Sequence, residues 1–514
     1  MSSEVEGPPV AGAEQIAEPK PPAPHRRRWE RLRRLLLRPF QSVVYEQSLV
    51  NRNLASAIEE LRESQGRVDD QLRSAAGDLA GRLLGQLADL QLEVHRLKSD
   101  VERLEGRIGG ISPMTASRSD RLVGSTPTGQ RFAPLPDGAG VNLIGDLTAT
   151  TGLAQAGRRL AVGLQRRGVP LSVTSVWSGA PRIDDLFPAE LRQLPAGSPH
   201  PVDLVTLNVN EVTFVAPDDL GFEHTGRYAI GAWYWEFDTL SPELVAQVGR
   251  VDEIWAPTTF VAHALGRYTT KPIHIVPTIV PVFEASAERG LLRRRWGIAD
   301  DEVAFLFTFD FNSSVVRKNP LGVVDAYRRA FGPKPAGTRL VMKAINLANS
   351  PAFESDLRAA VDDVGGVLID ERLSQEELGD LFHAADVYVS MHRCEGFGLG
   401  LAEAMAIGKA VIGTAYSGNV DFMSGSNSGL VGYRLRQITD DDHRYSRAVS
   451  TVYQPGYLCA EPYNEQAARW MRALAADADL RARIGSAASA TIAARFSEAA
   501  AVDTAVTRLE ALCR

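Results

Sequence analysis

Hydrophobic residues between positions 83 and 108 recur at alternating spacings of four and three. The positions in this repeat are Leu83, Leu87, Leu90, Val94, Leu97, Val101, Leu104 and Ile108. The stripe continues for about four heptads, and it is narrower than the hydrophobic face of a helix that packs into a globular core. We therefore predict a coiled coil within residues 41–110 that joins copies of the chain into a homo-oligomer. The alternative is one long helix packed on the globular part of its own chain.

The segments on either side of the predicted coiled coil differ in composition. Residues 1–24 are rich in Pro, Glu and Ala, which predicts a disordered tail. Residues 25–40 carry seven arginines together with Trp29 and several leucines on neighbouring helical positions. This pattern is typical of a basic amphipathic helix on an anionic membrane surface, and a solvated basic arm would have the same composition. The Ser, Thr and Pro residues of 111–137 favour a linker.

From residue 138 onward, short β-branched and aromatic runs alternate with helical stretches. A strand at 140–145 leads into a polar loop and a helix that we expect to open at Thr150 or Thr151. Further predicted strands lie at 202–207, 228–233, 253–256, 304–309, 338–344, 367–369 and 387–391. Strands that alternate with helices predict parallel sheets, so the fold class is α/β.

The same alternation divides the globular part into two Rossmann-like domains. We place the N-terminal domain at 138–285, the C-terminal domain at 286–480, and C-terminal helices that pack back on the N-terminal domain at 481–514. Ligands of open α/β sheets bind at the carboxyl ends of the strands. We therefore expect the two domains to face each other across a cleft.

Charge and cysteine content exclude several classes of protein. A net charge of −7 argues against a nucleic-acid-binding protein. The three cysteines, at 394, 459 and 513, form no CxxC pair and fit a reducing compartment. An acidic N-terminus argues against a signal peptide, and no apolar run reaches the roughly 18 residues of a spanning helix. We expect a cytoplasmic protein, with residues 25–40 as a means of peripheral attachment to the inner face of the membrane.

A glycine-rich loop lies between the predicted strand at 387–391 and the helical stretch at 401–407. Its sequence is Glu395-Gly-Phe-Gly-Leu-Gly-Leu-Ala-Glu403. The free N–H groups at the start of a helix attract anions such as a diphosphate, and glycines let the backbone approach a ligand closely. Glycine turns after strands are also common without any ligand.

The longer stretch from Ser390 to Met423 resembles retaining glycosyltransferases of family 4, whose signature is two glutamates separated by seven residues. The resemblance covers roughly residues 140–512 and implies the GT-B architecture. It also implies a metal-independent hexosyltransferase without a cofactor. Such an enzyme moves a sugar, with mannose-type hexoses favoured, from a nucleotide-sugar donor to a glycan or lipid-linked acceptor with retention. The expected setting is cell-envelope polysaccharide or glycolipid synthesis.

The resemblance also implies roles for residues of the donor site. Glu395 is expected to contact the donor sugar and Glu403 the ribose. Lys318 stands where the family has its phosphate-binding lysine, and we expect Lys318 and Glu395 to be catalytic. The backbone expected to contact sugar and phosphate is that of Gly396, Phe397, Gly398 and Leu399.

Other candidate residues have less support from the motif. The family commonly has an arginine five positions before the lysine, where this chain has Ser313, so either Arg317 supplies the second cation or that contact is weaker. Lys343 is a further cation near the donor. His392 lines the loop entrance as a ligand or as a structural histidine. On the acceptor or phosphate side we expect Gly152, Trp235 and Glu236, although such aromatic rings are more often part of a core.

Three alternatives remain open. A metal-dependent GT-A transferase would need an Asp-x-Asp motif after an early sheet, whereas Asp440-Asp-Asp-His443 stands late in the chain, in a polar run typical of a loop. A GT-B nucleotide-sugar epimerase would use a similar donor site without an acceptor. A non-catalytic coiled-coil scaffold with a transferase-like domain would retain the fold alone.

Overall fold

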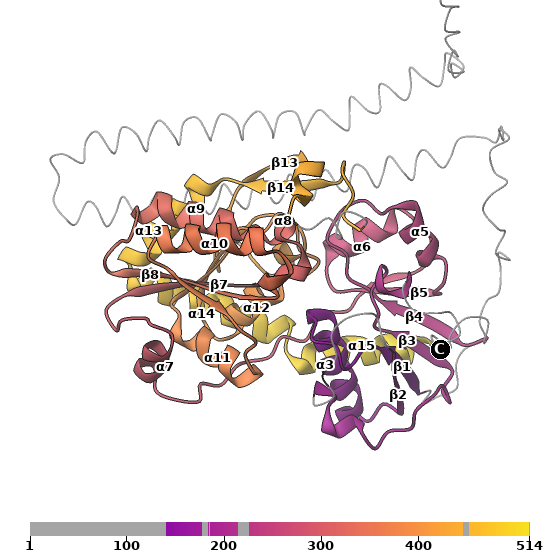
Figure 1. Ribbon diagram of the computed structural model, residues 1–514. Coiled ribbons are helices and arrows are strands. Elements are labelled where there is room, and N and C mark those ends of the chain that lie inside the picture. The colour runs from indigo at the N-terminus through magenta and orange to yellow at the C-terminus, as the bar shows by residue number, and fades with distance from the viewer. Residues whose placement is uncertain (1–139, 177–182, 184–185, 214–225, 446–451, 513–514) are drawn as a thin grey trace, which may run out of the picture. The chain divides into compact units, whose positions relative to one another are not determined.

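The computed structural model describes residues 140–176, 183, 186–213, 226–445 and 452–512 (Figure 1). The predicted tail, the basic segment 25–40, the coiled coil within 41–110 and the linker 111–137 lie outside the described residues. These four predictions therefore stay predictions.

The N-terminal half is built on a six-stranded parallel sheet (Figure 1). Its strand order is β2–β1–β3–β4–β5–β6, and the strands are β1 (Val141–Gly145), β2 (Leu171–Ser175), β3 (Val202–Val205), β4 (Tyr228–Ala232), β5 (Glu253–Ala256) and β6 (Ile273–Ile275). The helices are α3 (Gly152–Arg166), α5 (Pro242–Val248) and α6 (Thr259–Gly266). Thr151 begins α3 because its side-chain oxygen accepts a hydrogen bond from the N–H of Ala154.

The C-terminal half repeats this architecture. Its six-stranded parallel sheet has the order β12–β11–β10–β7–β8–β9, with strands β7 (Val303–Asp310), β8 (Thr338–Ile345), β9 (Val367–Asp370), β10 (Val387–Ser390), β11 (Ala410–Thr414) and β12 (Gly429–Val431). A hairpin of β13 (Tyr433–Gln437) and β14 (Leu458–Pro462) follows. The helices are α7 (Arg289–Arg295), α8 (Val315–Lys318), α9 (Pro320–Phe331), α10 (Pro351–Asp363), α11 (Gln375–Ala384), α12 (Leu399–Ala406), α13 (Asn464–Ala476), α14 (Ala478–Arg495) and α15 (Glu498–Leu512).

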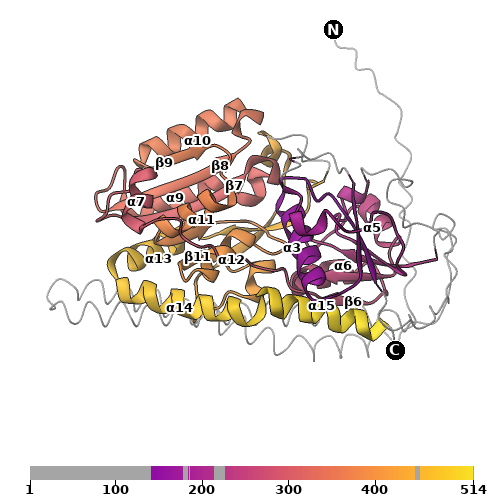
Figure 2. The ribbon, with the colours of Figure 1, turned by 90° about the horizontal axis from the view of Figure 1, so that it is seen from below.

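The C-terminal helices connect the two halves. Helix α14 packs on α12 and β11, and α15 continues to α3 of the N-terminal half (Figure 2). One hydrophobic cluster also combines residues of both halves, including Trp235 and Phe260 with Tyr416 and Cys459. The rings of Phe260 and Tyr416 meet edge to face, with centroids 5.7 Å apart. The halves therefore share core contacts as well as polar ones.

The prediction of an α/β fold is confirmed by the two parallel sheets. The strands that the sequence pattern missed include β2 and β6, which lie at the two edges of the first sheet.

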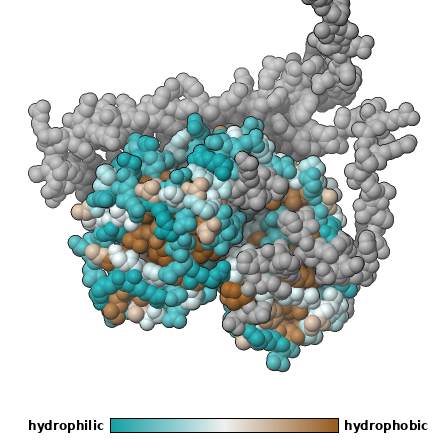
Figure 3. All heavy atoms as spheres, viewed as in Figure 1, coloured by the Kyte–Doolittle hydropathy of each residue, from teal (hydrophilic) through white to brown (hydrophobic). Residues whose placement is uncertain are grey.

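On the face shown in Figure 3, hydrophilic residues cover much of the described surface and hydrophobic residues form separate areas. Among the described helices, none has the length and apolar character needed to cross a membrane.

Candidate active site

The short helix α8 is held at the carboxyl edge of the second sheet by an unusual turn on each side. It follows β7 and a 3₁₀ turn at Phe311–Ser313. Ser314 before it and Asn319 after it both have positive φ angles, of 71° and 51°. The Asn319 side chain donates a hydrogen bond to the carbonyl oxygen of Met391, just beyond β10 (2.7 Å). This bond fixes α8 beside the loop that carries Glu395.

Two cations of α8 meet at the first glutamate of the signature. Lys318 Nζ lies 2.5 Å from Glu395 Oε1, and Arg317 Nη1 lies 2.7 Å from Glu395 Oε2. Arg317 also reaches Glu236 of the N-terminal half, with 3.6 Å between Nη2 and Oε1. The Tyr453 hydroxyl donates to the other oxygen of Glu236 (3.4 Å). The site is therefore a chain of alternating charges that joins the two halves.

Arg317, one of the two possibilities for the second cation, lies beside Lys318 at Glu395. Ser313 contributes only its carbonyl oxygen, which accepts a hydrogen bond from Arg317 Nε (3.2 Å). The guanidinium that reaches Glu395 comes from position 317, next to Lys318. A second cation is thus present beside the lysine, although the position at which the family commonly has arginine is a serine.

The members of the cluster shift one another's pKa values. Burial raises the pKa of Glu395, but Lys318 and Arg317 outweigh it and bring the pKa to about 2. Burial lowers the pKa of Lys318, and Glu395 opposes that effect. The pKa of Arg317 lies well above its ordinary value because Glu395 and Glu236 outweigh its burial. At neutral pH an ionised Glu395 carboxylate therefore faces the Arg317 guanidinium and the Lys318 amino group.

The glycine loop leads from Glu395 into the open end of α12. The Glu395 N–H donates to Ser417 Oγ (2.7 Å), and the Gly418 N–H donates to the Glu395 carbonyl (2.8 Å). Gly398 then takes a φ of +95°, a conformation that favours glycine, and no side chain caps the helix that follows. The first N–H groups of α12 are therefore left for an anion.

The side chains of the loop have separate surroundings. The carbonyl of Gly396 accepts a hydrogen bond from Thr258 Oγ1 of the N-terminal half (2.9 Å). The ring of Phe397 packs between Phe422 and Phe496, so this residue offers a ligand only its backbone. Leu399 is the first residue of α12 and is half-buried.

Glu403 meets a partner that the sequence did not indicate. Arg159 of α3 places Nη2 3.3 Å from Glu403 Oε1, across the boundary between the halves. Burial raises the pKa of Glu403 to about 7, with Arg159 opposing the effect. The two signature glutamates therefore have opposite pKa shifts, which is typical of carboxyl groups with different roles. The pair Arg158–Arg159 was visible in the sequence, but nothing local connects it to a residue so far along the chain.

Other candidates lie outside this cluster. His392 is fully buried, with Ser390 Oγ 3.1 Å from Nδ1 and Asn419 Oδ1 2.9 Å from Nε2. Burial lowers its pKa, so the ring is a neutral support of the loop in this conformation. Lys343 lies in β8, opposite Thr308 of β7, and burial lowers its pKa to about 8.

On the N-terminal half, Gly152 is exposed, the side chain of Glu236 is mostly buried and Trp235 is fully buried. Gly152 is exposed at the first position of α3. Trp235 is 0% exposed and its indole N–H donates to the carbonyl of Thr239 (2.9 Å). The prediction that its ring stacks on a sugar is therefore wrong for this conformation, because the residue belongs to the core shared by both halves.

The acidic run considered for a GT-A metal site is a 3₁₀ turn, Asp440–His443. The carboxylate of Asp442 is held by Arg436 through two contacts of 2.7 and 2.8 Å. Within the described ranges, no group of His, Cys, Asp and Glu side chains is arranged to hold a metal ion.

A family model described as "Glycosyl transferases group 1" matches residues 366–434, which include both signature glutamates. No protein of curated function matches the sequence significantly.

Solved structures share the fold at low sequence identity. HepE from Anabaena, in complex with UDP and glucose, aligns with a TM-score of 0.50 and 14% identity over 72% of this chain and 99% of its own. Sucrose-phosphate synthase from Thermosynechococcus elongatus aligns with a TM-score of 0.52 and 14% identity over 72% of this chain and 98% of its own. A glycosyltransferase from Rickettsia africae aligns with a TM-score of 0.51 and 13% identity over 73% of this chain and 99% of its own. The chain thus has the GT-B fold of glycosyltransferases.

Proposed function

We propose that the protein is a glycosyltransferase that moves a hexose from a nucleotide-sugar donor to a glycan or lipid-linked acceptor. The observation that carries the proposal is the pair of cations, Lys318 and Arg317, held on Glu395 beside the uncapped start of α12. The family match over residues 366–434 supports the same activity.

The cluster suits the charge that develops in such a reaction. The bond between the sugar and the diphosphate breaks, a bond from the sugar to the acceptor oxygen forms, and the leaving phosphate gains negative charge. Lys318 and Arg317 stabilise that charge, because they are fixed in place before the reaction. When the diphosphate binds, Lys318 exchanges part of its contact with Glu395 for a phosphate oxygen. Glu395 is then free to accept hydrogen bonds from the sugar hydroxyls.

The second glutamate acts on the nucleoside. A carboxyl group with a pKa of about 7 can donate as well as accept hydrogen bonds near neutral pH, which suits a pair of ribose hydroxyls. Arg159 contacts Glu403, and this contact gives way to the ribose when the nucleotide binds.

The finer features of the proposal come from the family resemblance and the sequence. The transfer proceeds with retention: the acceptor hydroxyl attacks on the face that the phosphate leaves, and its proton passes to that phosphate. No metal takes part, and mannose-type hexoses are favoured in cell-envelope polysaccharide or glycolipid synthesis. Residues 25–40 bring the enzyme to the inner membrane surface, and the coiled coil within 41–110 makes it an oligomer.

A thermal-shift panel of UDP-, GDP- and ADP-hexoses tests the proposal. A donor present at about a hundred times its dissociation constant adds about 2.7 kcal/mol to the free energy of unfolding. UDP-hexoses come first, because the HepE structure with the same fold contains UDP and glucose. We expect one donor to raise the melting temperature of the wild type and to lose much of this effect with Lys318→Ala. A panel in which no donor stabilises the protein would count against the proposal.

A further inference from the structure

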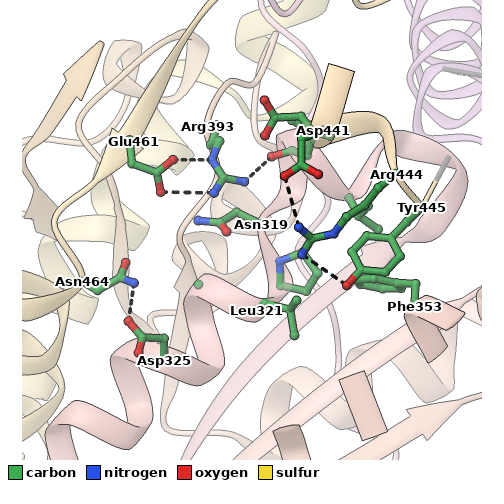
Figure 4. Close-up of a pocket in the computed structure, with 15 residues that line it drawn as sticks. Asn319, Leu321, Asp325, Phe353, Arg393, Asp441, Arg444, Tyr445, Glu461 and Asn464 are labelled. Carbon is green, nitrogen blue, oxygen red and sulfur yellow. Dashed lines mark hydrogen bonds and ion pairs between the residues drawn. The ribbon is translucent and has the colours of Figure 1, made fainter. Parts of the chain in front are cut away.

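A cavity lies beside α8 in the C-terminal half (Figure 4). Val315 and Val316 line it, whereas Arg317 and Lys318 of the same helix contact Glu395. Its volume is about 370 Å³, which lies within the range of sites for small ligands. The proposed donor site does not account for this cavity.

Paired polar groups surround the cavity. Arg393 and Glu461 form a two-pronged ion pair, with contacts of 2.9 and 3.1 Å. Asn464 donates to Asp325 (2.6 Å), and Arg444 contacts Asp441 (3.3 Å). In Figure 4 these pairs come from different sides and leave space between them. Each carboxylate in a single pair keeps lone pairs that can accept further hydrogen bonds.

One polar atom in the wall lacks a partner. Asn464 Oδ1 is buried and accepts no hydrogen bond from the residues that the structure describes. A buried acceptor without a donor costs free energy. Phe353 and Tyr445 supply an aromatic side to the cavity, with ring centroids 5.1 Å apart, and Leu321 supplies an aliphatic one.

The charges of the wall decide which ligand fits. An anion is disfavoured because carboxylates outnumber guanidinium groups around the cavity and both guanidiniums are already paired. A cation is disfavoured because Glu461 and Asp442 are neutralised by arginines. A neutral ligand with several hydroxyl groups can donate to the carboxylates and to Asn464 and accept from the guanidiniums. Its C–H faces can pack on Phe353 and Leu321.

We propose that this cavity is a second carbohydrate site, which holds one pyranose unit of a glycan away from the site of transfer. The inference rests on the proposed function only for the source of that sugar, since a glycan acceptor would supply it. Arg393 connects the cavity to the transfer site. Its side chain lines the cavity and donates to the carbonyl of Val316, while its N–H donates to the carbonyl of Arg317 (both 2.8 Å). A sugar that contacts Arg393 thereby touches the residue that holds α8 in place.

Saturation-transfer NMR on the full chain tests the site directly. The probes are the methyl α-pyranosides of D-glucose, D-galactose, D-mannose and N-acetyl-D-glucosamine at millimolar concentration. We expect at least one probe to receive saturation from the wild-type protein. Leu321→Trp fills the cavity and should abolish the signal, whereas the matched variant Leu321→Met should keep it. Arg444→Met changes a largely exposed side chain, which should not affect folding, and should reduce the signal.

A Glu395→Gln variant separates this site from the site of transfer. The signal should survive in it, and its loss there would assign the bound sugar to the donor site and overturn the proposal. The proposal would also be overturned if no probe gave a signal, or if the signal persisted in both Leu321→Trp and Arg444→Met. The experiment contains no nucleotide sugar, so a failed donor panel would contradict the proposed function without affecting this result.

Discussion

Replacing Glu403 with glutamine should change how the stability of the protein depends on pH. Glu403 is 5% exposed, and burial raises the pKa of its carboxyl group from 4.5 to about 7. A carboxyl group with a raised pKa is more stable protonated in the folded protein than in the unfolded chain. Its contribution to stability is therefore fully present below pH 4.5 and is lost as the pH rises through about 7.

The size of the effect follows from the two pKa values. Each pH unit between 4.5 and about 7 lowers the contribution by about 1.4 kcal/mol, which amounts to roughly 2–4 kcal/mol in total. Glutamine has a similar shape and does not titrate. The stability of Glu403→Gln relative to the wild type should therefore increase by this amount between pH 4.5 and pH 8, whatever the offset between the two proteins at low pH.

Thermal unfolding of both proteins across this pH window measures the difference. For a domain of about 150–250 residues, 1 kcal/mol corresponds to a change of about 2–4 °C in melting temperature. Contributions from other groups cancel in the comparison. Glu395→Gln is the comparison: the pKa of Glu395 is about 2, so its own carboxyl group does not titrate near pH 7. A constant difference for Glu403→Gln would refute the assigned environment of Glu403.

Three further predictions concern other parts of the molecule. Glu395→Gln should leave the affinity for the nucleoside diphosphate intact in calorimetry while sugar transfer falls sharply; full activity would overturn its role. Gly400→Ala places a Cβ 2.4 Å from the Tyr388 hydroxyl and should lower the free energy of unfolding by roughly 1–3 kcal/mol. Gly152→Ala, with no atom within 4 Å of the new Cβ, is its control, and equal stability of the two variants would contradict the packing. The double change Val94→Asp and Leu97→Asp should dissociate the oligomer by burying charge in its seam, and an unchanged mass in light scattering would contradict the coiled coil.

Local signals in the sequence were sufficient for most strands of the two sheets and for the signature loop. Thr151 and Thr258 carry cap side chains directly before their helices, and the glycine loop stands between a strand and a helix. Weak elements were missed for a physical reason. The edge strand β2 alternates with serine and threonine, and β6 has only three residues, so neither has a strong hydrophobic pattern.

Contacts between distant residues could not be predicted from the sequence. Arg159 and Glu403 are 244 positions apart, and only the packing of one half on the other makes them partners. The same packing buries Trp235, which in sequence looks like an aromatic residue available at the end of a strand. The contact of Arg317 with Glu395 likewise depends on the geometry of α8 and is not visible in the sequence.

We propose that Lys318, with Arg317 and Glu395, stabilises a departing nucleoside diphosphate. Phosphorus NMR of the full chain mixed with UDP- and GDP-hexoses follows this step directly, in the wild type and in Lys318→Ala. We expect one donor to be consumed with release of its nucleoside diphosphate. The rate in Lys318→Ala should fall on the order of a hundredfold, because one preorganised cation contributes roughly 2–3 kcal/mol to the transition state. No consumption of any donor, or equal rates in the two proteins, would contradict the account.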